Sequence, residues 1–361
     1  MREPGVDRVK IAIGQLEGFC SEALRRAGVD EAAALTAARI LVLADAWGIF
    51  THGVRNLGGY LRRIQAGGIR ATGQPRVTAD GPAWALVDGD AALGMVGGAF
   101  AMRTAMQKAR ACGIGYAGLR NTCHFGAAGC YAVMAARDGM IGIAMANDTP
   151  TVTAPGAAGP VLGSNPFAFA APAGGEPPVV LDIATSTVAG GKVFLAAARG
   201  ESIPEGWVVD GNGAPTIDPT VFTAFPHRGA LTPMAAHKGY GLAFMIETLT
   251  SILAGAGVVR TLASWSFSDS TVPTDHSAAF IAVDVAAMPT GSAFPDKVCA
   301  MIREIRALPK AAGAGRICVP GELEWERHAR AVQEGIDLPA EVASALREVA
   351  VTMGLAGLPS S

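Results

Sequence analysis

Apolar residues along this chain recur with two spacings, one typical of helices and one typical of strands. Helical spacing near the N-terminus predicts helices over residues 6–28 and 30–47, the second with Asp30 as its N-cap. A third amphipathic segment, residues 54–66, is closed by a pair of glycines. The same spacing predicts further helices over residues 98–112, 127–137, 188–199, 234–253, 292–307 and 340–353.

Short apolar runs lie between these helices and end at turn-forming residues, which is the pattern of buried strands. The alternation of such runs with helices is typical of an α/β fold. Residues 200–233 contain no long periodic segment, so they are predicted to be rich in loops. The predicted strands are residues 83–88, 114–119, 141–146, 167–171, 179–183 and 279–285.

Residues 113–118 (Gly-Ile-Gly-Tyr-Ala-Gly) match the glycine pattern of dinucleotide-binding loops. That fingerprint indicates a pyrophosphate site only where a strand precedes it and a helix follows it. Here a predicted helix precedes the glycines and a predicted strand contains them. We therefore reject a Rossmann-type dinucleotide site at this position.

Four clusters of small or polar residues follow predicted strands or loops between residues 121 and 192. In α/β folds, the loops at strand ends hold ligands and carry catalytic groups. Tight turns use the same residue types for backbone reasons, and this simpler interpretation competes with a binding site for any single cluster. Four clusters in succession favour a binding cleft. They are residues 121–126, 147–148, 162–166 and 182–186.

Two further segments place basic side chains at predicted helix starts. His52 lies at or just before the start of the 54–66 helix, where an imidazole can face a cleft and the helix dipole favours its neutral form. A capping or surface role is the alternative for a lone histidine in this place. His237 and Lys238 lie at the entrance of the 234–253 helix, and cations there oppose the helix dipole unless an anion is bound. This pair therefore indicates an anion site.

Composition narrows the classes of function. Of the 361 residues, 50% are hydrophobic and 17% are charged, so a large buried core is expected. The net charge of −2 and the lack of a basic run argue against nucleic acid as a partner. No apolar stretch is long enough to cross a bilayer, and the N-terminus lacks the apolar core of a signal peptide. A cytoplasmic protein without membrane contact is expected.

The six cysteines have no paired spacing and are expected to be mostly buried thiols. Cys123 precedes His124, a combination that suggests a nucleophile or a metal ligand. Because no Cys-x-x-Cys or His-x-x-x-His motif accompanies it, no metal site is expected.

Several motifs together resemble the type-2 malate/L-lactate dehydrogenase family, which also includes sulfolactate, ureidoglycolate and diketogulonate oxidoreductases and reductases of cyclic imino acids. The motifs occur in the order found in the family and span nearly the whole chain. They are Thr51-His52-Gly53-Val54 with Tyr60, Asn121-x-x-His124-Phe125-Gly126, Leu162-Gly163-Ser164-Asn165-Pro166, Leu181-Asp182-Ile183-Ala184-Thr185-Ser186, Gly191-Lys192-Val193, His237-Lys238-Gly239-Tyr240-Gly241 and Val319-Pro320-Gly321-Glu322.

The resemblance implies an NAD- or NADP-dependent oxidoreductase that acts on a small 2-hydroxy or 2-oxo carboxylic acid or on a cyclic imino acid. It implies a three-layer α/β fold around a mixed sheet, similar to sulfolactate dehydrogenase and unlike a Rossmann domain, in a homodimer with its cleft near the interface. Residues 1–75 would form a helical lobe packed with the tail 310–361, and residues 121–259 would bind the cofactor. Residues 76–120 and 260–309 would complete the substrate and dimer lobe.

Carried over by position, the resemblance makes His52 the proton donor to the carbonyl or imine, oriented by Thr51. His124 would share or take over this acid/base role. Asn147 and Tyr60 would position the substrate. The segments that would cradle the dinucleotide contribute Ser164, Asn165, Asp182, Ile183, Ala184, Thr185, Lys192, His237, Lys238, Gly239, Gly321 and Glu322.

One position departs from the family pattern. The family places an arginine, which clamps the substrate carboxylate, four residues after the motif histidine, whereas this chain has Asn56 there and Arg55 one residue earlier. Both positions lie near the helix face of His52, so Arg55 can reach the same anion from another angle. Asparagine cannot replace the charge of a guanidinium–carboxylate pair. The alternatives are therefore a substrate other than a simple 2-oxo acid, or a protein that binds the cofactor without catalysis.

Overall fold

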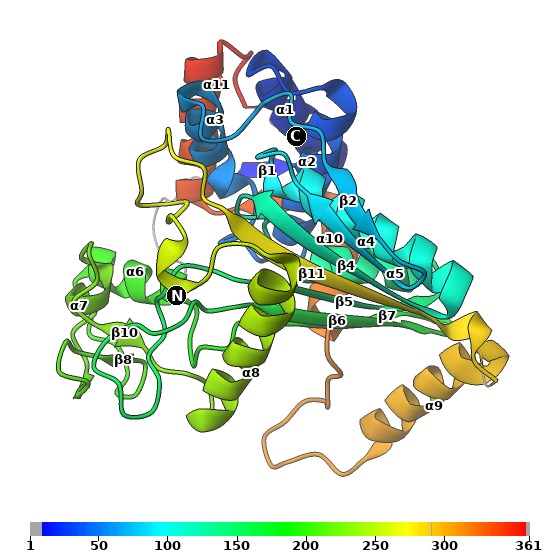
Figure 1. Cartoon of the computed structure of the whole chain (residues 1–361). Helices are drawn as coiled ribbons and strands as arrows, with labels where there is room; N and C mark the ends of the chain where they lie inside the picture. The colour runs from blue at the N-terminus through cyan, green and yellow to red at the C-terminus, as the bar shows by residue number, and fades with distance from the viewer. Residues whose placement is uncertain (1–8, 290, 359–361) are drawn as a thin grey trace.

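One mixed sheet of seven strands organises the computed structural model, which describes residues 9–289 and 291–358 (Figure 1). Strands β3 and β4 run parallel, and every other neighbouring pair in this sheet is antiparallel. The order across the sheet is β2 (Arg76–Asp80), β3 (Trp84–Asp88), β4 (Ile114–Thr122), β11 (His276–Asp284), β5 (Met140–Ala146), β6 (Phe167–Ala173) and β7 (Glu176–Ile183).

Helices cover both faces of this sheet (Figure 1). Helices α4 (Gly94–Cys112) and α5 (Gly129–Arg137) pack on one face. Helix α8 (His237–Glu247) and the π-helical turn that continues it pack on the other. Close approach of α4 needs Gly115 of β4, because a Cβ there would overlap the backbone carbonyl of Ala105. The predicted three-layer α/β fold with a mixed sheet is confirmed.

The glycines of residues 113–118 do not form a dinucleotide-binding loop. Gly113 has a φ of +82° and ends α4, and the following residues lie inside β4. A helix therefore precedes the glycines and a strand contains them, as the sequence predicted.

The two ends of the described chain lie together (Figure 1). Strand β1 (Val9–Ile11) pairs antiparallel with β12 (Ile336–Leu338). Helices from both ends share one apolar core with the face of α4, because none of them can bury its apolar stripe alone. These helices are α1 (Ile13–Arg26), α2 (Glu31–Ala46), α3 (Leu57–Ala66), α10 (Glu322–Glu334) and α11 (Ala340–Met353).

The predicted loop-rich segment, residues 200–233, contains only short elements, as expected. Strands β10 (Ala230–Leu231), β8 (Val208–Val209) and β9 (Pro215–Thr216) form a small separate sheet beside α7 (Thr220–Thr223). Helix α6 (Gly190–Arg199) precedes this segment, and α9 (Phe294–Ala307) follows the central sheet.

Some sequence predictions were wrong in detail. The first predicted helix, residues 6–28, begins only at Ile13, because residues 9–11 pair with β12 instead; its first three residues lie outside the described part of the chain. Helix α4 begins at Gly94 rather than at residue 98, since several glycines disguise its first turn. The helix predicted to end at residue 253 leaves α-helical geometry at Glu247. Elements β2, α10 and β12 were not predicted.

Arg63 of α3 is almost fully buried, at 1% exposure, and its guanidinium donates to backbone carbonyls of residues 264–272. Its Nε donates to Trp265 O at 2.7 Å, and its terminal nitrogens donate to Ser264 O at 2.8 Å and Val272 O at 2.9 Å. A fourth bond reaches Ser268 O at 3.2 Å. The loop therefore depends on a buried charge for its donors.

Replacing Arg63 by Met is expected to lower the free energy of unfolding by about 3–5 kcal/mol, because four partly buried carbonyls lose their donor. Amide hydrogen exchange should accelerate first in residues 264–272. The neighbouring Arg62 is exposed, so Arg62→Met is the matched control and should shift the free energy little. Equal effects of the two substitutions in urea unfolding would contradict the assignment.

Candidate active site

His52 lies in the turn between α2 and the 3-10 turn Val54–Asn56 that leads into α3. Its Nδ1 lies 2.9 Å from the Thr51 hydroxyl. Asp45 of α2 fixes this turn, because its carboxyl group accepts the Val54 N–H at 2.9 Å. A side chain at Gly53 would overlap the Asp45 carboxyl, so glycine is required for this approach. Burial raises the pKa of Asp45 well above its usual range.

His124 follows the end of β4, and three aromatic groups surround it. The Tyr60 hydroxyl lies 2.6 Å from His124 Nδ1, and Tyr60 itself is fully buried. The ring of Trp265 stacks on His124 with centroids 4.4 Å apart. On the other side, the His52 ring lies 5.6 Å away at an interplanar angle of 29°. Helix α3, the loop held by Arg63 and the end of β4 thus converge on one pair of histidines.

Burial keeps these two imidazoles neutral near pH 7. The pKa of His52 is lowered by burial, although the nearby Asp148 carboxylate acts in the opposite direction. The pKa of His124 is lowered to about 3, first by burial and then by His52 and His276, while Asp148 opposes them. A neutral imidazole can accept a proton, so His52 is suited to acid/base chemistry, whereas the larger lowering of its pKa makes His124 the weaker base.

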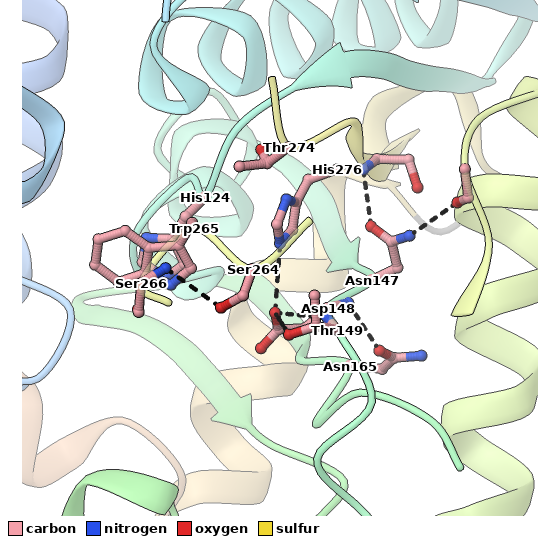
Figure 2. A network of polar contacts seen from close by, with 12 residues as sticks. His124, Asn147, Asp148, Thr149, Asn165, Ser264, Trp265, Ser266, Thr274 and His276 are labelled. Atoms are coloured by element: carbon pink, nitrogen blue, oxygen red, sulfur yellow. Dashed lines mark hydrogen bonds and ion pairs between the residues drawn. The ribbon is translucent and has the colours of Figure 1, made fainter. Parts of the chain in front are cut away.

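Asp148 and His276 form a second polar group beside the histidines (Figure 2). Asp148 Oδ1 lies 3.3 Å from His276 Nε2 and accepts the Thr149 N–H at 2.7 Å. Burial by itself raises the pKa of Asp148, but the hydrogen bond and charge interaction with His276 lower it below its usual range. His276 is 4% exposed, and its Nδ1 is buried without a hydrogen-bond partner in the described part of the chain.

The sequence did not single out this group. Asp148 belongs to one of the predicted strand-end clusters, but no role was assigned to it. His276 begins β11, which lies between β4 and β5 in the sheet although it is distant from both in sequence. Only this strand order brings His276 beside Asp148.

Asn147 and Asn165 are buried and use their amides within the protein. Asn147 donates to Ser251 Oγ at 2.7 Å and accepts the Ser277 N–H at 2.8 Å. Asn165 accepts the Asp148 N–H at 3.0 Å and donates to Glu247 Oε2 at 2.9 Å. Both amides therefore fix the strand ends around Asp148.

Arg55 and Asn56 differ in how they are held. The Asn56 amide donates to Thr51 O at 2.9 Å and so braces the turn that carries His52. Arg55 is exposed, and within residues 9–289 and 291–358 it makes no ion pair.

The predicted cofactor segments near β7 come together at the end of this strand. Thr185 donates its hydroxyl to Ser164 O at 2.8 Å, which ties the two segments to each other. Asp182 accepts the Gly129 N–H at 2.8 Å at the start of α5, and burial raises its pKa to about 6. Ile183 is the last residue of β7, and Ala184 joins it to Thr185.

Two helix starts adjoin these segments. Gly191 at the start of α6 packs against Thr51, and Lys192 next to it is exposed. His237 and Lys238 are exposed at the start of α8, while Gly239 packs on the carbonyl of Thr185. A cavity of about 600 Å³ opens beside the α8 start, between residues 153–158 and the loops of the small sheet.

Gly321 and Glu322 lie against the edge strand β7. Gly321 has a φ of +85° and packs on Val180, whose N–H bonds to Pro320 O at 3.2 Å. Glu322 pairs with Arg306 at 3.2 Å. These two residues therefore lie at the sheet edge, and the contacts described for them do not include His52 or His124.

All six cysteines are free, and four of them are buried, as expected. Among the described residues, no group of three or more His, Cys, Asp or Glu side chains has an arrangement that could hold a metal ion. In the same part of the chain, no helix has both the length and the apolar character needed to span a membrane.

The chain is similar to known proteins over nearly its full length. The sequence profile of malate/L-lactate dehydrogenases matches residues 11–347. A malate dehydrogenase of Pyrococcus abyssi is 36% identical over 97% of this chain and 96% of its own length. A ureidoglycolate dehydrogenase (NAD(+)) of Escherichia coli O157:H7 is 33% identical over 92% of this chain and 94% of its own.

A solved structure has the same fold. Malate dehydrogenase from Pyrococcus horikoshii superposes with a TM-score of 0.87 at 33% identity, covering 99% of both chains.

Replacing Gly53 by Ala is expected to lower the free energy of unfolding by about 1–3 kcal/mol and to displace the His52 ring, because the new methyl group meets the Asp45 carboxyl. Thermal unfolding and the imidazole NMR signals of His52 report the two effects. Gly18→Ala is the matched control: Gly18 lies in α1 with open space around it, so alanine should stabilise the helix slightly. An unchanged His52 signal in Gly53→Ala would refute the steric argument.

Proposed function

The chain belongs to the malate/L-lactate dehydrogenase family and is an oxidoreductase of small hydroxy and oxo acids; within that class we propose that its chemistry occurs at the His52–His124 pair. The reaction transfers a hydride between a nicotinamide cofactor and the reacting carbon of a 2-hydroxy or 2-oxo acid, or of a cyclic imino acid. The stacked, neutral histidines carry this proposal.

His52 is the acid/base residue in this proposal. In the oxidation, its neutral imidazole would accept the proton of the substrate hydroxyl, and a bound nicotinamide would supply the hydride chemistry at the same substrate carbon. In the reduction, the protonated ring returns a proton to the oxygen or nitrogen. The Thr51 hydroxyl at Nδ1 sets the ring orientation and leaves Nε2 for the substrate.

His124 supports or shares this role, and Tyr60 positions it. Tyr60 is fully buried behind His124, so its hydroxyl acts on the imidazole at 2.6 Å rather than on the substrate. Asn147 likewise acts through the strand ends that its amide holds.

The nicotinamide cofactor supplies the hydride chemistry when bound, and the segments around the end of β7 are its proposed cradle. Ser164, Asn165 and residues 182–185 would form the floor, and exposed Lys192 and Lys238 would meet its phosphates at the starts of α6 and α8. Gly321 and Glu322 would bound it at the β7 edge. Both NAD and NADP are candidates.

A second candidate function is binding of the cofactor without turnover. The observation that favours it is Asn56, whose amide is engaged with the Thr51 carbonyl, so no guanidinium occupies the usual carboxylate-binding position. In the catalytic proposal, exposed Arg55 supplies that charge instead.

We further propose a cytoplasmic homodimer. Six free cysteines fit a reducing compartment. Apolar side chains that single chains rarely leave in water gather on α8 and the π-helical turn after it. Phe244, Ile252 and Leu253 are 57%, 59% and 54% exposed, and Leu242 and Met245 lie with them.

The first test follows the loss of nicotinamide absorbance from NADH and NADPH with a panel of 2-oxo acids, dicarboxylic oxo acids and cyclic imino acids. Turnover of at least one member is expected. His52→Ala should lower kcat by roughly 10²–10⁴-fold while the affinity for the cofactor changes little. Cofactor binding without turnover of any member would favour the second candidate function. Unchanged turnover in His52→Ala would show that His52 is not the acid/base residue.

The dimer is tested by the mass of the particle in solution. Phe244→Glu combined with Ile252→Glu should convert a particle of two chains into a single chain, as measured by sedimentation or light scattering, since buried charges oppose association. Val351→Glu is the control, because Val351 is 84% exposed on α11, away from this face. A wild-type protein that is already a single chain would disprove the proposal.

A further inference from the structure

Only one of the two carboxylate oxygens of Asp148 makes hydrogen bonds within the described part of the protein. Oδ1 accepts the Thr149 N–H and faces His276 Nε2. Oδ2 makes no hydrogen bond or ion pair with any described residue, and the side chain is 29% exposed. Since the Asp148 N–H is anchored on Asn165, the carboxylate is held in place with one oxygen open to a ligand.

No lysine or arginine among the described residues pairs with this carboxylate. The buried guanidinium of Arg63 is engaged with the carbonyls of residues 264–272. His276 meets only Oδ1, and its hydrogen bond and charge interaction hold the pKa of Asp148 below its usual range. Asp148 is therefore ionised near neutral pH, and its Oδ2 is left for a ligand.

This charge acts on the reacting centre. Asp148 influences the protonation of both His52 and His124, which places it within electrostatic reach of the atoms where a substrate would react. Beside it, the partly exposed Trp265 lies parallel to His124 (Figure 2). A carboxylate beside aromatic rings is an environment that binds organic cations.

We propose that the substrate of this oxidoreductase carries a protonated nitrogen and that Asp148 is its counter-ion. The inference rests on the proposed function and specifies its substrate class. A second carboxylate on the substrate would meet Asp148 as a like charge, so dicarboxylic acids such as malate are disfavoured. The cation is either a protonated imine at the reacting carbon or an amino or guanidino group elsewhere on a hydroxy or oxo acid.

Matched substrates test the proposal on the full-length protein. A guanidino-substituted 2-oxo acid is compared with the alkyl 2-oxo acid of equal length, and a six-membered cyclic imino acid and oxaloacetate complete the set. The wild type should have the highest kcat/KM for a cationic member and the lowest for oxaloacetate. Whether the guanidino acid or the cyclic imine is preferred identifies the source of the cation.

Asp148→Asn keeps the shape and the Thr149 hydrogen bond but removes the charge. Because the charge also acts on the two histidines, all substrates share part of the effect, but kcat/KM for the cationic substrates should fall about 10- to 100-fold more than that for the alkyl acid, and the value for oxaloacetate should rise relative to the alkyl acid. Glu348→Gln is the control for the loss of one negative charge, because Glu348 is exposed on α11. Asp148→Ser repeats the test if the asparagine variant unfolds.

If the protein turns over any of these substrates, three results would overturn the proposal. One is a wild-type preference for the neutral or dicarboxylic members, and another is an equal loss for all substrates in Asp148→Asn, which indicates a structural role. The third is that Asp148→Asn weakens binding of the oxidised cofactor more than binding of the reduced cofactor and leaves the substrate preference unchanged. Asp148 would then balance the positive charge of the nicotinamide.

If no substrate is turned over, the proposed function itself is contradicted first. Calorimetric titration of the guanidino acid in the presence of NADH then decides: binding lost in Asp148→Asn supports Asp148 as the counter-ion, and no binding overturns it.

Discussion

The buried guanidinium of Arg63 is the interaction on which the site depends. Residues 264–272 contain only turns and bends, so their inward carbonyls have no helix or sheet to supply donors. Arg63 supplies four, and the loop in return gives the buried charge its hydrogen bonds. Because Tyr60 is on the same helix and Trp265 is on the loop, this single contact positions His124 from two sides.

Desolvation then sets the chemistry of the histidines. The packing that brings Tyr60, Trp265 and the two imidazoles together excludes water, and the lowered pKa values of His52 and His124 follow from it. Asp45 and Arg63 act alike, because each is a buried polar side chain that hydrogen-bonds to the backbone. Asp45 accepts an N–H of the turn that carries His52, and Arg63 donates to the carbonyls of the loop that carries Trp265. Rigid support of this kind keeps acid/base groups at their working distance.

The charges around this pair are unevenly distributed. The described residues offer Asp148 as a partly free carboxylate on one side, whereas the only arginine of the His52 turn, Arg55, is exposed on the surface. Family membership defines the reaction, and in our proposal this balance of charge selects among hydroxy, oxo and imino acids.

The sequence alone determined what depends on neighbours in the chain. Helical periodicity and the Asp30 cap correctly predicted α2, and α11 was predicted near its observed bounds, because both depend on local spacing and caps. The ordered motifs predicted the family, the mixed three-layer fold and the reaction class. The residues proposed for the site came from the same motifs, and their roles remain for experiment.

Tertiary structure decided what depends on distant partners. Strands β1 and β12 are three residues each and exist because they pair with each other across almost the whole chain, so neither has a local signal. His276 meets Asp148, 128 residues away, only because β11 inserts between β4 and β5. The hydrogen bonds that Asn147 and Tyr60 make to distant residues were equally hidden. Burial and hydrogen-bond partners arise when the sheet assembles, and no periodicity along the chain encodes them.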